Sequence, residues 1–364
     1  MAFKSIAKSI LHDAELLDEY IRANNLPQPS FDVDGPPRTV YTGETATAHA
    51  SLLANTHRLH LLAEGPAGRW LPSLAGATGD AVTTAAVQHF KIADHVPLDS
   101  QASFEDVAEK CGLALRDFKI IVRYAMTNFI FCEPQPGFIA HTAASKLLAE
   151  NRLIRASAAM RTDDIFLPGF KEIEALEKFP GSQEPTESAW GLAHNASLPM
   201  FEELEARHPE RAKTFASAIE AISAAIADTA QLGVYDWASL GSGTLVDVGG
   251  GKGYACRPLA KHFPELSFIV QDLEGTAATG REQLPPDLHD RVTFMTHDFF
   301  TPQPVKGADA YYFRAIFHNW PDKYCVRILQ NLIPSLKKGA RVLIHDPHTP
   351  DPLTSHPWAE RQTR

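Results

Sequence analysis

The sequence is poor in cysteine: only four occur among 364 residues, widely spaced and without a C-x-x-C pair. This argues against a disulfide framework or a zinc knuckle and is typical of a reducing compartment. The formal net charge is −10 and no long basic stripe occurs, so nucleic acid is not an expected partner. No apolar run resembles a signal peptide or a membrane span. We therefore expect a cytoplasmic protein, not bound to membranes, long enough for two domains and a large core.

One glycine-rich stretch, Thr244–Gly253, organises the rest of the chain. Its residues Leu245–Val248 are predicted to form a buried strand, and Tyr254–Phe263 has the composition of a short helix. A strand, a glycine turn and a helix present bare backbone N–H groups and a helix N-terminus to a ligand. The glycine spacing is G-x-G-x-G, unlike the G-x-G-x-x-G of dinucleotide dehydrogenases. The stretch is either a nucleotide cradle or a tight turn that binds nothing.

Four further apolar runs are predicted to be strands of the same sheet: Leu266–Val270, Arg291–Thr296, Ala308–Phe313 and Arg341–His345. Polar residues directly follow the carboxyl end of each run, which is where open α/β sheets bind ligands. Asp272, about 20 residues past the glycines, is where ribose hydroxyls are held. Asp298 is a candidate acceptor for an adenine amino hydrogen, with Phe299 beside the base.

These motifs, with the Phe317-His-Asn-Trp320 turn after the fourth strand, resemble the plant caffeate-type family of S-adenosylmethionine-dependent O-methyltransferases. The likeness is greatest to the fungal secondary-metabolite branch and runs from about residue 40 to the end. It implies an α/β fold with a C-terminal Rossmann-like methyltransferase sheet and a mainly helical N-terminal domain that contains a winged helix. It also implies S-adenosylmethionine as cofactor, a metal-independent reaction, and a small aromatic or polyketide substrate.

The resemblance assigns roles to particular residues. His318 matches the general base of the family, and Asp346 matches an acidic residue that orients this base, although Asp is one methylene shorter than the Glu of the family. The residues expected to hold the donor are Asp247, Gly249, Gly251, Asp272, Leu273, Asp298, Phe299 and Arg314. From composition, and not from the resemblance, the residues expected to line the acceptor pocket are His141, Phe166, Trp190, Met200 and Trp320.

The chemistry suits these residue types. Methyl transfer to oxygen requires that the acceptor be aligned and lose a proton, and an imidazole, with an ordinary pKa of about 6.5, is a base at neutral pH. Plainer interpretations stay open: His318 satisfies only its strand–helix turn, His141 satisfies only the junction that Thr142 caps, and the aromatic residues are simply core.

Composition divides the chain into four regions: 1–80, an N-terminal helical segment; 81–150, a winged-helix module; 151–236, a helical linker and pocket region; and 237–364, the donor-binding domain. The first region is predicted to contain amphipathic helices over 3–24 and 43–63. In the family such helices join two subunits, so we expect a homodimer; the alternative is that they pack on their own domain.

The winged-helix module is predicted from three helices followed by a hairpin. The helices cover 85–93, a stretch capped by Ser103, and a stretch after Leu113; the hairpin pairs Ile130–Cys132 with Phe138–Ala140. Winged helices often bind DNA. Because this chain is acidic, we interpret the few basic residues of the third helix as a solvent-exposed face and do not expect DNA binding.

The sequence also departs from the family. The family sheet has seven strands and a second catalytic Glu, whereas five strands are predicted here, Glu360 comes too early, and the chain ends at Arg364. We expect either an incomplete copy of a longer protein or a naturally short chain. The group formed by His345, His348, Asp351 and His356 is read as a solvated loop, not a metal site.

Three functions follow. The favoured one is O-methylation of a phenolic or enolic secondary metabolite, with His318 as base. The second is a pericyclase or dehydratase that keeps the donor as a fixed positive charge, with His141 and Arg314 bonding the reacting carbonyl; Asn319, in place of the commoner Asp, favours it. The third is an inactive, truncated homologue.

Overall fold

The structure is a computed structural model and describes residues 3–225 and 232–347. The described chain forms two compact units, one up to Thr162 and one from Asp163 to Pro347. Within the described residues, no helix has both the length and the apolarity needed to cross a bilayer. Of the residues considered in the sequence, His348, Asp351, His356 and Glu360 lie outside the described residues.

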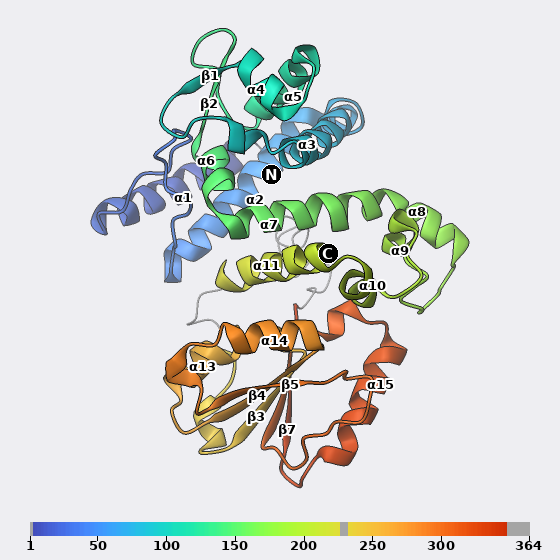
Figure 1. Cartoon of the computed structure of the whole chain (residues 1–364). Coiled ribbons are helices and arrows are strands. Elements are labelled where there is room, and N and C mark those ends of the chain that lie inside the picture. Colours follow the sequence, from blue (N-terminus) through green and yellow to red (C-terminus); the bar gives the residue numbers. More distant parts are fainter. Residues whose placement is uncertain (1–2, 226–231, 348–364) are drawn as a thin grey trace. The chain divides into compact units, whose positions relative to one another are not determined.

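The first unit begins with the helices α1 (Phe3–Ala23) and α2 (Gly43–Trp70), which pack on each other (Figure 1). Ile6, Leu17 and Ile21 of α1 are buried, which confirms the predicted helix. Helix α2 extends beyond its predicted end and kinks at Gly65, where φ is +68° ahead of a proline.

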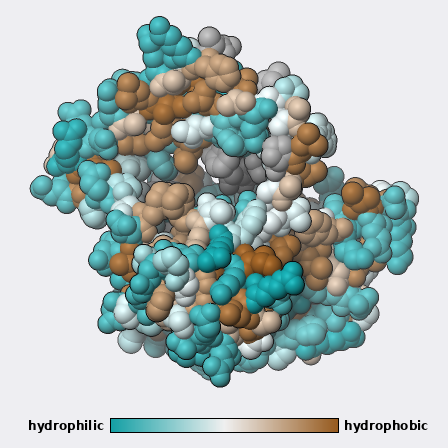
Figure 2. All heavy atoms as spheres, turned by 90° about the horizontal axis from the view of Figure 1, so that it is seen from above, coloured by the Kyte–Doolittle hydropathy of each residue, from teal (hydrophilic) through white to brown (hydrophobic). Residues whose placement is uncertain are grey.

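Much of the predicted apolar face of α2 stays exposed. The side chain of Leu53 is 40% exposed and that of Leu62 is 45% exposed, whereas the buried residues of the helix are the small Ala48 and Ala54. Figure 2 shows apolar side chains gathered between hydrophilic ones on one face of the molecule. Within its own unit, α2 therefore leaves large apolar side chains uncovered.

The winged-helix core lies between α3 (Pro72–His89), α4 (Phe104–Cys111) and α5 (Leu115–Thr127). The predicted cap is confirmed, because Ser103 Oγ accepts a hydrogen bond of 3.1 Å from the N–H of Asp106. The predicted helix over 85–93 is only the last part of the longer α3, which ends before Lys91 at φ +50°.

The predicted hairpin pairing is confirmed at one residue pair only: Cys132 and Ala140 exchange both of their backbone hydrogen bonds, at 3.0 Å each. Strand β2 (Phe138–Ala140) pairs antiparallel with β1 (Gln101–Ser103), and Cys132 makes only an isolated bridge to Ala140. Phe129 and Phe131 have φ values of +56° and +68°, which no extended strand adopts. The ring of Phe131 is buried in the winged-helix core, so packing holds this twisted backbone in place. After β2, the helices α6 (Ala143–Glu150) and α7 (Arg152–Met160) complete the unit.

The second unit begins with helices and continues with a sheet. Its helices are α8 (Leu167–Lys178), α9 (Ala189–His194), α10 (Met200–Arg207) and α11 (Pro209–Ala225). Its strands are β3 (Thr244–Val248), β4 (Ser267–Asp272), β5 (Val292–Thr296), β6 (Ala310–Arg314) and β7 (Arg341–His345). All five predicted strands are therefore confirmed.

The five strands are parallel, in the order β5-β4-β3-β6-β7. Helices α13 (Cys256–His262) and α14 (Glu274–Glu282) connect β3, β4 and β5, and α15 (Asp322–Leu332) connects β6 to β7 (Figure 1). Side chains alternate between two cores: Leu245 packs with α13, and Val246 packs with α15. Because all strands are parallel, their carboxyl ends lie along one side of the sheet, and the topological switch point is between β3 and β6.

Candidate active site

The glycine turn after β3 leaves its backbone open. Gly251 has a φ of +60°, and a Cβ added there would meet no atom of the described part of the chain within 4 Å. Gly249 has a φ of +71°, and a Cβ added there would lie 2.5 Å from Ile316 Cδ1. Only glycine fits both conditions without strain, and the free space at Gly251 lets a ligand approach the backbone closely.

Asp247 lies under this turn and is fully buried. Cys256 Sγ, on the first residue of α13, donates to Asp247 Oδ2 at 3.1 Å, whereas Asp247 Oδ1 has no hydrogen-bond partner among the described residues. Burial raises the pKa of Asp247 to about 6. Cys256, which helps to hold this carboxyl group, belongs to no motif and was not predicted as a site residue.

Asp272 ends β4 beside the glycine turn. The N–H of Gly251 donates to Asp272 Oδ2 at 2.8 Å, and the N–H of Leu273 donates to Asp272 Oδ1 at 2.9 Å. Burial raises the pKa of Asp272 to about 6. Each carboxylate oxygen keeps a second lone pair, so Asp272 retains acceptor capacity at the position predicted for ribose hydroxyls.

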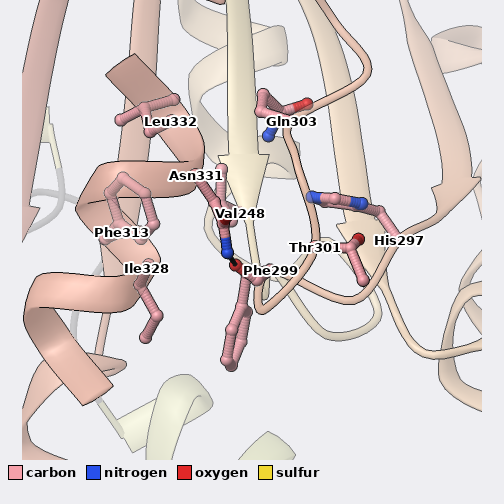
Figure 3. Close-up of a pocket in the computed structure, with 9 residues that line it drawn as sticks. All are labelled: Val248, His297, Phe299, Thr301, Gln303, Phe313, Ile328, Asn331 and Leu332. Atoms are coloured by element: carbon pink, nitrogen blue, oxygen red, sulfur yellow. Dashed lines mark hydrogen bonds between the residues drawn. The ribbon is translucent and has the colours of Figure 1, made fainter. Parts of the chain in front are cut away.

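The loop after β5 carries Asp298 and Phe299. Asp298 Oδ1 accepts from the N–H of Phe300 at 2.8 Å, and Asn331 Nδ2 of α15 donates to the Phe299 carbonyl at 3.3 Å (Figure 3). Behind the loop lies a cavity of about 10 Å³, to which the buried His297 contributes. This volume suits about one water molecule and no larger ligand, so we interpret the cavity as a packing feature of the loop.

His318 and Asp346 meet directly. His318 Nδ1 lies 2.8 Å from Asp346 Oδ1, and Asp346 Oδ2 accepts from the N–H of Phe317 at 3.0 Å. His318 follows β6 and Asp346 follows β7, which are neighbouring parallel strands, so the fold brings both side chains to the same edge. The side chain of His318 is 39% exposed and that of Asp346 is 15% exposed. The imidazole is thus held at one nitrogen while its ring remains accessible.

Arg314 ends β6, the strand between β3, which carries Asp247, and β7, which ends at His345. Its positive charge opposes the effect of burial on the pKa of Asp247. Burial, and then the charge of Arg314, lower the pKa of His345, whose Nδ1 lies 2.8 Å from the hydroxyl of Tyr312. His345 thus has a partner of its own in the sheet, the hydroxyl of Tyr312 on β6.

The residues predicted to line the acceptor pocket are found in different surroundings. Trp320, two residues after His318, lies edge to face against Phe299 and Phe300, with ring centroids 5.9 and 4.6 Å away. Its ring also lies 6.3 Å from Phe201 of α10, the helix that Met200 begins. Trp320 therefore joins the donor loop to the helical part of the unit.

Trp190 and Phe166 belong to another part of the second unit. Trp190 is buried, its Nε1 donates to Asp164 Oδ1 at 3.1 Å, and the guanidinium of Arg211 lies 5.7 Å from its ring. Phe166 ends a short π-helical turn, Arg161–Phe166, and is half-buried. Trp190 thus has a well-defined structural role in a polar network.

His141 lies in the first unit and is 4% exposed. Its Nδ1 lies 2.9 Å from Ser145 Oγ and its Nε2 lies 3.1 Å from the Val96 carbonyl. Burial lowers its pKa. Thr142 caps the following helix as predicted, accepting from the N–H of Ser145. With both ring nitrogens bonded, the geometry supports the interpretation of His141 as a residue of this junction.

Comparison with known proteins identifies the family. Residues 176–351 match the family described as "O-methyltransferase domain". The chain is 37% identical over 364 residues to the grayanic acid biosynthesis cluster O-methyltransferase of Cladonia grayi, a match that covers 99% of this chain and 76% of that protein.

Two solved structures share the fold. The structure of OxaC in complex with sinefungin and meleagrin has a TM-score of 0.79 and 22% identity, covering 99% of this chain and 87% of that one. A protein described as a pericyclic reaction enzyme has a TM-score of 0.66 and 23% identity, covering 88% of this chain and 83% of that one.

The fold is thus that of the Rossmann-like methyltransferases. The chain belongs to the S-adenosylmethionine-dependent O-methyltransferases of secondary metabolism, as the sequence motifs predicted. The residues present fit this donor: an open glycine turn, a buried carboxylate under it with one oxygen that no described residue bonds, and Asp272 at the next strand end.

Proposed function

We propose that the protein transfers a methyl group from S-adenosylmethionine to a phenolic or enolic hydroxyl of a secondary metabolite, with His318 as the general base. The observation that carries this proposal is the pair of contacts at Asp346. One oxygen accepts from the backbone N–H of Phe317, and the other lies 2.8 Å from His318 Nδ1. Since a carboxylate can only accept, the proton of the neutral imidazole lies on Nδ1. His318 Nε2 therefore presents a lone pair and can take a proton.

The residues then divide the work as follows. The donor supplies an activated methyl group on a sulfonium. It would be held by Asp247, Gly249, Gly251, Asp272, Leu273, Asp298, Phe299 and Arg314. His318 Nε2 removes the hydroxyl proton of the acceptor, and Asp346 orients the ring and stabilises the imidazolium that forms. Trp320, together with Met200, Phe166 and Trp190, is proposed to border a flat acceptor.

We also propose a homodimer formed through the N-terminal helices. The supporting observation is the exposure of Leu53 and Leu62 on α2, because apolar surface of this kind is covered when two subunits associate.

The test is to incubate the purified protein with methyl-labelled S-adenosylmethionine and an extract of a producing strain that lacks this gene. Mass spectrometry would then search for a labelled product and for S-adenosylhomocysteine; a reaction without protein is the control. A labelled product formed together with S-adenosylhomocysteine supports methyl transfer. An unlabelled new product that needs the donor would contradict it and favour a pericyclase or dehydratase. That alternative requires His141 to bond a carbonyl, whereas both of its ring nitrogens are already bonded.

A further inference from the structure

The short helix α10 contacts the proposed site at two places, one near Asp272 of the donor site and one near His318. Phe201 and Glu205 are four residues apart on it, so both side chains lie on the same helix face, about 6 Å apart along the axis. Glu205 Oε1 accepts a hydrogen bond of 3.2 Å from the N–H of Gly275, three residues after Asp272. The ring of Phe201 lies 6.3 Å from that of Trp320, two residues after His318.

The contact at Gly275 involves a backbone group that has no partner within its own helix. Gly275 is the second residue of α14, and the first N–H groups of a helix lack intrahelical acceptors. A carboxylate at this end is also favoured by the helix dipole. Glu205 is therefore held at the nucleoside end of the donor site by a specific contact between segments 70 residues apart.

Further contacts hold α10 against its entry loop and against α11. Glu203 is buried and accepts from the N–H groups of Ser197 and Leu198 at 3.3 and 3.2 Å, so it holds the loop that leads into the helix. Phe201 also lies edge to face against Phe215 of α11, with centroids 5.8 Å apart. With its entry loop and its apolar side held, α10 can transmit the position of Glu205 to Phe201.

We propose that Glu205 is a positioning residue for the donor: it fixes α10 to the start of α14, so that Phe201 at the other end of the same face holds Trp320 beside His318. This proposal rests on the proposed function, because it assumes that the donor binds between these two strand ends. The helix would thus be in place before the donor arrives, and binding would not have to order it. A site that exists in only part of the molecules binds its ligand more weakly by that fraction.

The test uses three substitutions at the contact and one control. Glu205→Ala removes the acceptor. Gly275→Ala keeps Glu205 but places a Cβ 2.9 Å from its Oε1, which pushes the carboxylate away, at a position where alanine is otherwise favourable in a helix. Glu205→Gln keeps a carbonyl acceptor and should restore the contact. Glu202→Ala removes an exposed carboxylate from the first turn of the same helix and is the matched control.

Two measurements are made on the full chain: the Kd for S-adenosylmethionine by calorimetry, and hydrogen exchange of residues 200–207 and 273–282 without donor. We expect Glu205→Ala and Gly275→Ala to raise the donor Kd about fivefold, the worth of one net hydrogen bond, and to speed exchange in both segments. Glu205→Gln and Glu202→Ala should stay close to wild type in both measurements.

The outcomes separate this inference from the function on which it rests. If the wild-type protein does not bind S-adenosylmethionine, the proposed function fails. If the wild type binds but Glu205→Ala matches Glu202→Ala in Kd and in exchange, the positioning role of Glu205 is wrong. Tighter donor binding by Glu205→Ala would also overturn it, because α10 would then obstruct the site.

Discussion

Replacing Asp346 by asparagine keeps the size of the side chain but changes one oxygen into an NH₂ group. The N–H of Phe317 can only donate, so the remaining amide oxygen must face it, as Asp346 Oδ2 does now. The NH₂ group then faces His318 Nδ1, which must act as acceptor, and the ring proton moves to Nε2. In this tautomer His318 presents a donor to the acceptor hydroxyl and cannot serve as its base.

The size of the effect follows from this role. General base catalysis contributes about 10²- to 10⁴-fold to a rate, equivalent to about 3–5 kcal/mol of transition-state stabilisation. We expect Asp346→Asn to lower kcat by this factor, whereas the donor Kd stays within about twofold because Asp346 is not among the donor-binding residues. The assay is methyl transfer from labelled S-adenosylmethionine at saturating donor, with calorimetry for the Kd.

Two further variants make the test specific. Asp346→Ala loses the orienting contact but does not impose the wrong tautomer, so its kcat should lie above that of Asp346→Asn. Asp322→Asn, an exposed carboxylate at the start of α15, is the control and should leave kcat unchanged. An Asp346→Asn enzyme with the wild-type kcat would refute the tautomer argument and the role of His318 as base.

Three other predictions concern the donor turn and the oligomeric state. Gly251→Ala places a methyl group in the open space at φ +60°, so we expect at least a tenfold rise in the donor Kd by calorimetry. An unchanged Kd would contradict the proposal that this glycine turn binds the donor. Burial raises the pKa of Asp247 from 3.8 to about 6, so this carboxyl group contributes a loss of stability of about 3 kcal/mol as pH rises through this range. The change in unfolding free energy between pH 4 and pH 8, measured by denaturant unfolding, should therefore be more favourable in Asp247→Asn than in the wild type by about this amount. Glu in place of both Leu53 and Leu62 should convert a homodimer into monomers in light scattering, and a dimer that survives would show that α2 is not its interface.

The sequence predicted the sheet well because its signals are local. Each strand is a short apolar run followed by polar residues, and parallel strands bring these residues to one edge whatever the details of packing. For the same reason the position of Asp346 near His318 was predictable. What remained uncertain was whether an aspartate reaches the imidazole, and the distance of 2.8 Å shows that it does.

Features that depend on contacts between distant segments were not predictable. Strand β2 forms its ladder with β1 and keeps only the Cys132–Ala140 bridge of the predicted hairpin, because Phe131 turns inward at a positive φ. The contact between Glu205 and Gly275 spans 70 residues and involves a backbone N–H, which leaves no trace in residue type. The contact of His141 Nε2 likewise depends on the Val96 carbonyl, 45 residues away.

The central claim is that His318 removes the acceptor proton during methyl transfer. The most direct test is His318→Ala, assayed for transfer of labelled methyl to the acceptor at saturating donor, with the donor Kd measured on the same preparation. We expect transfer to fall by at least about 10²-fold while the Kd stays within about twofold of wild type. Methyl transfer at the wild-type rate by His318→Ala would contradict the account.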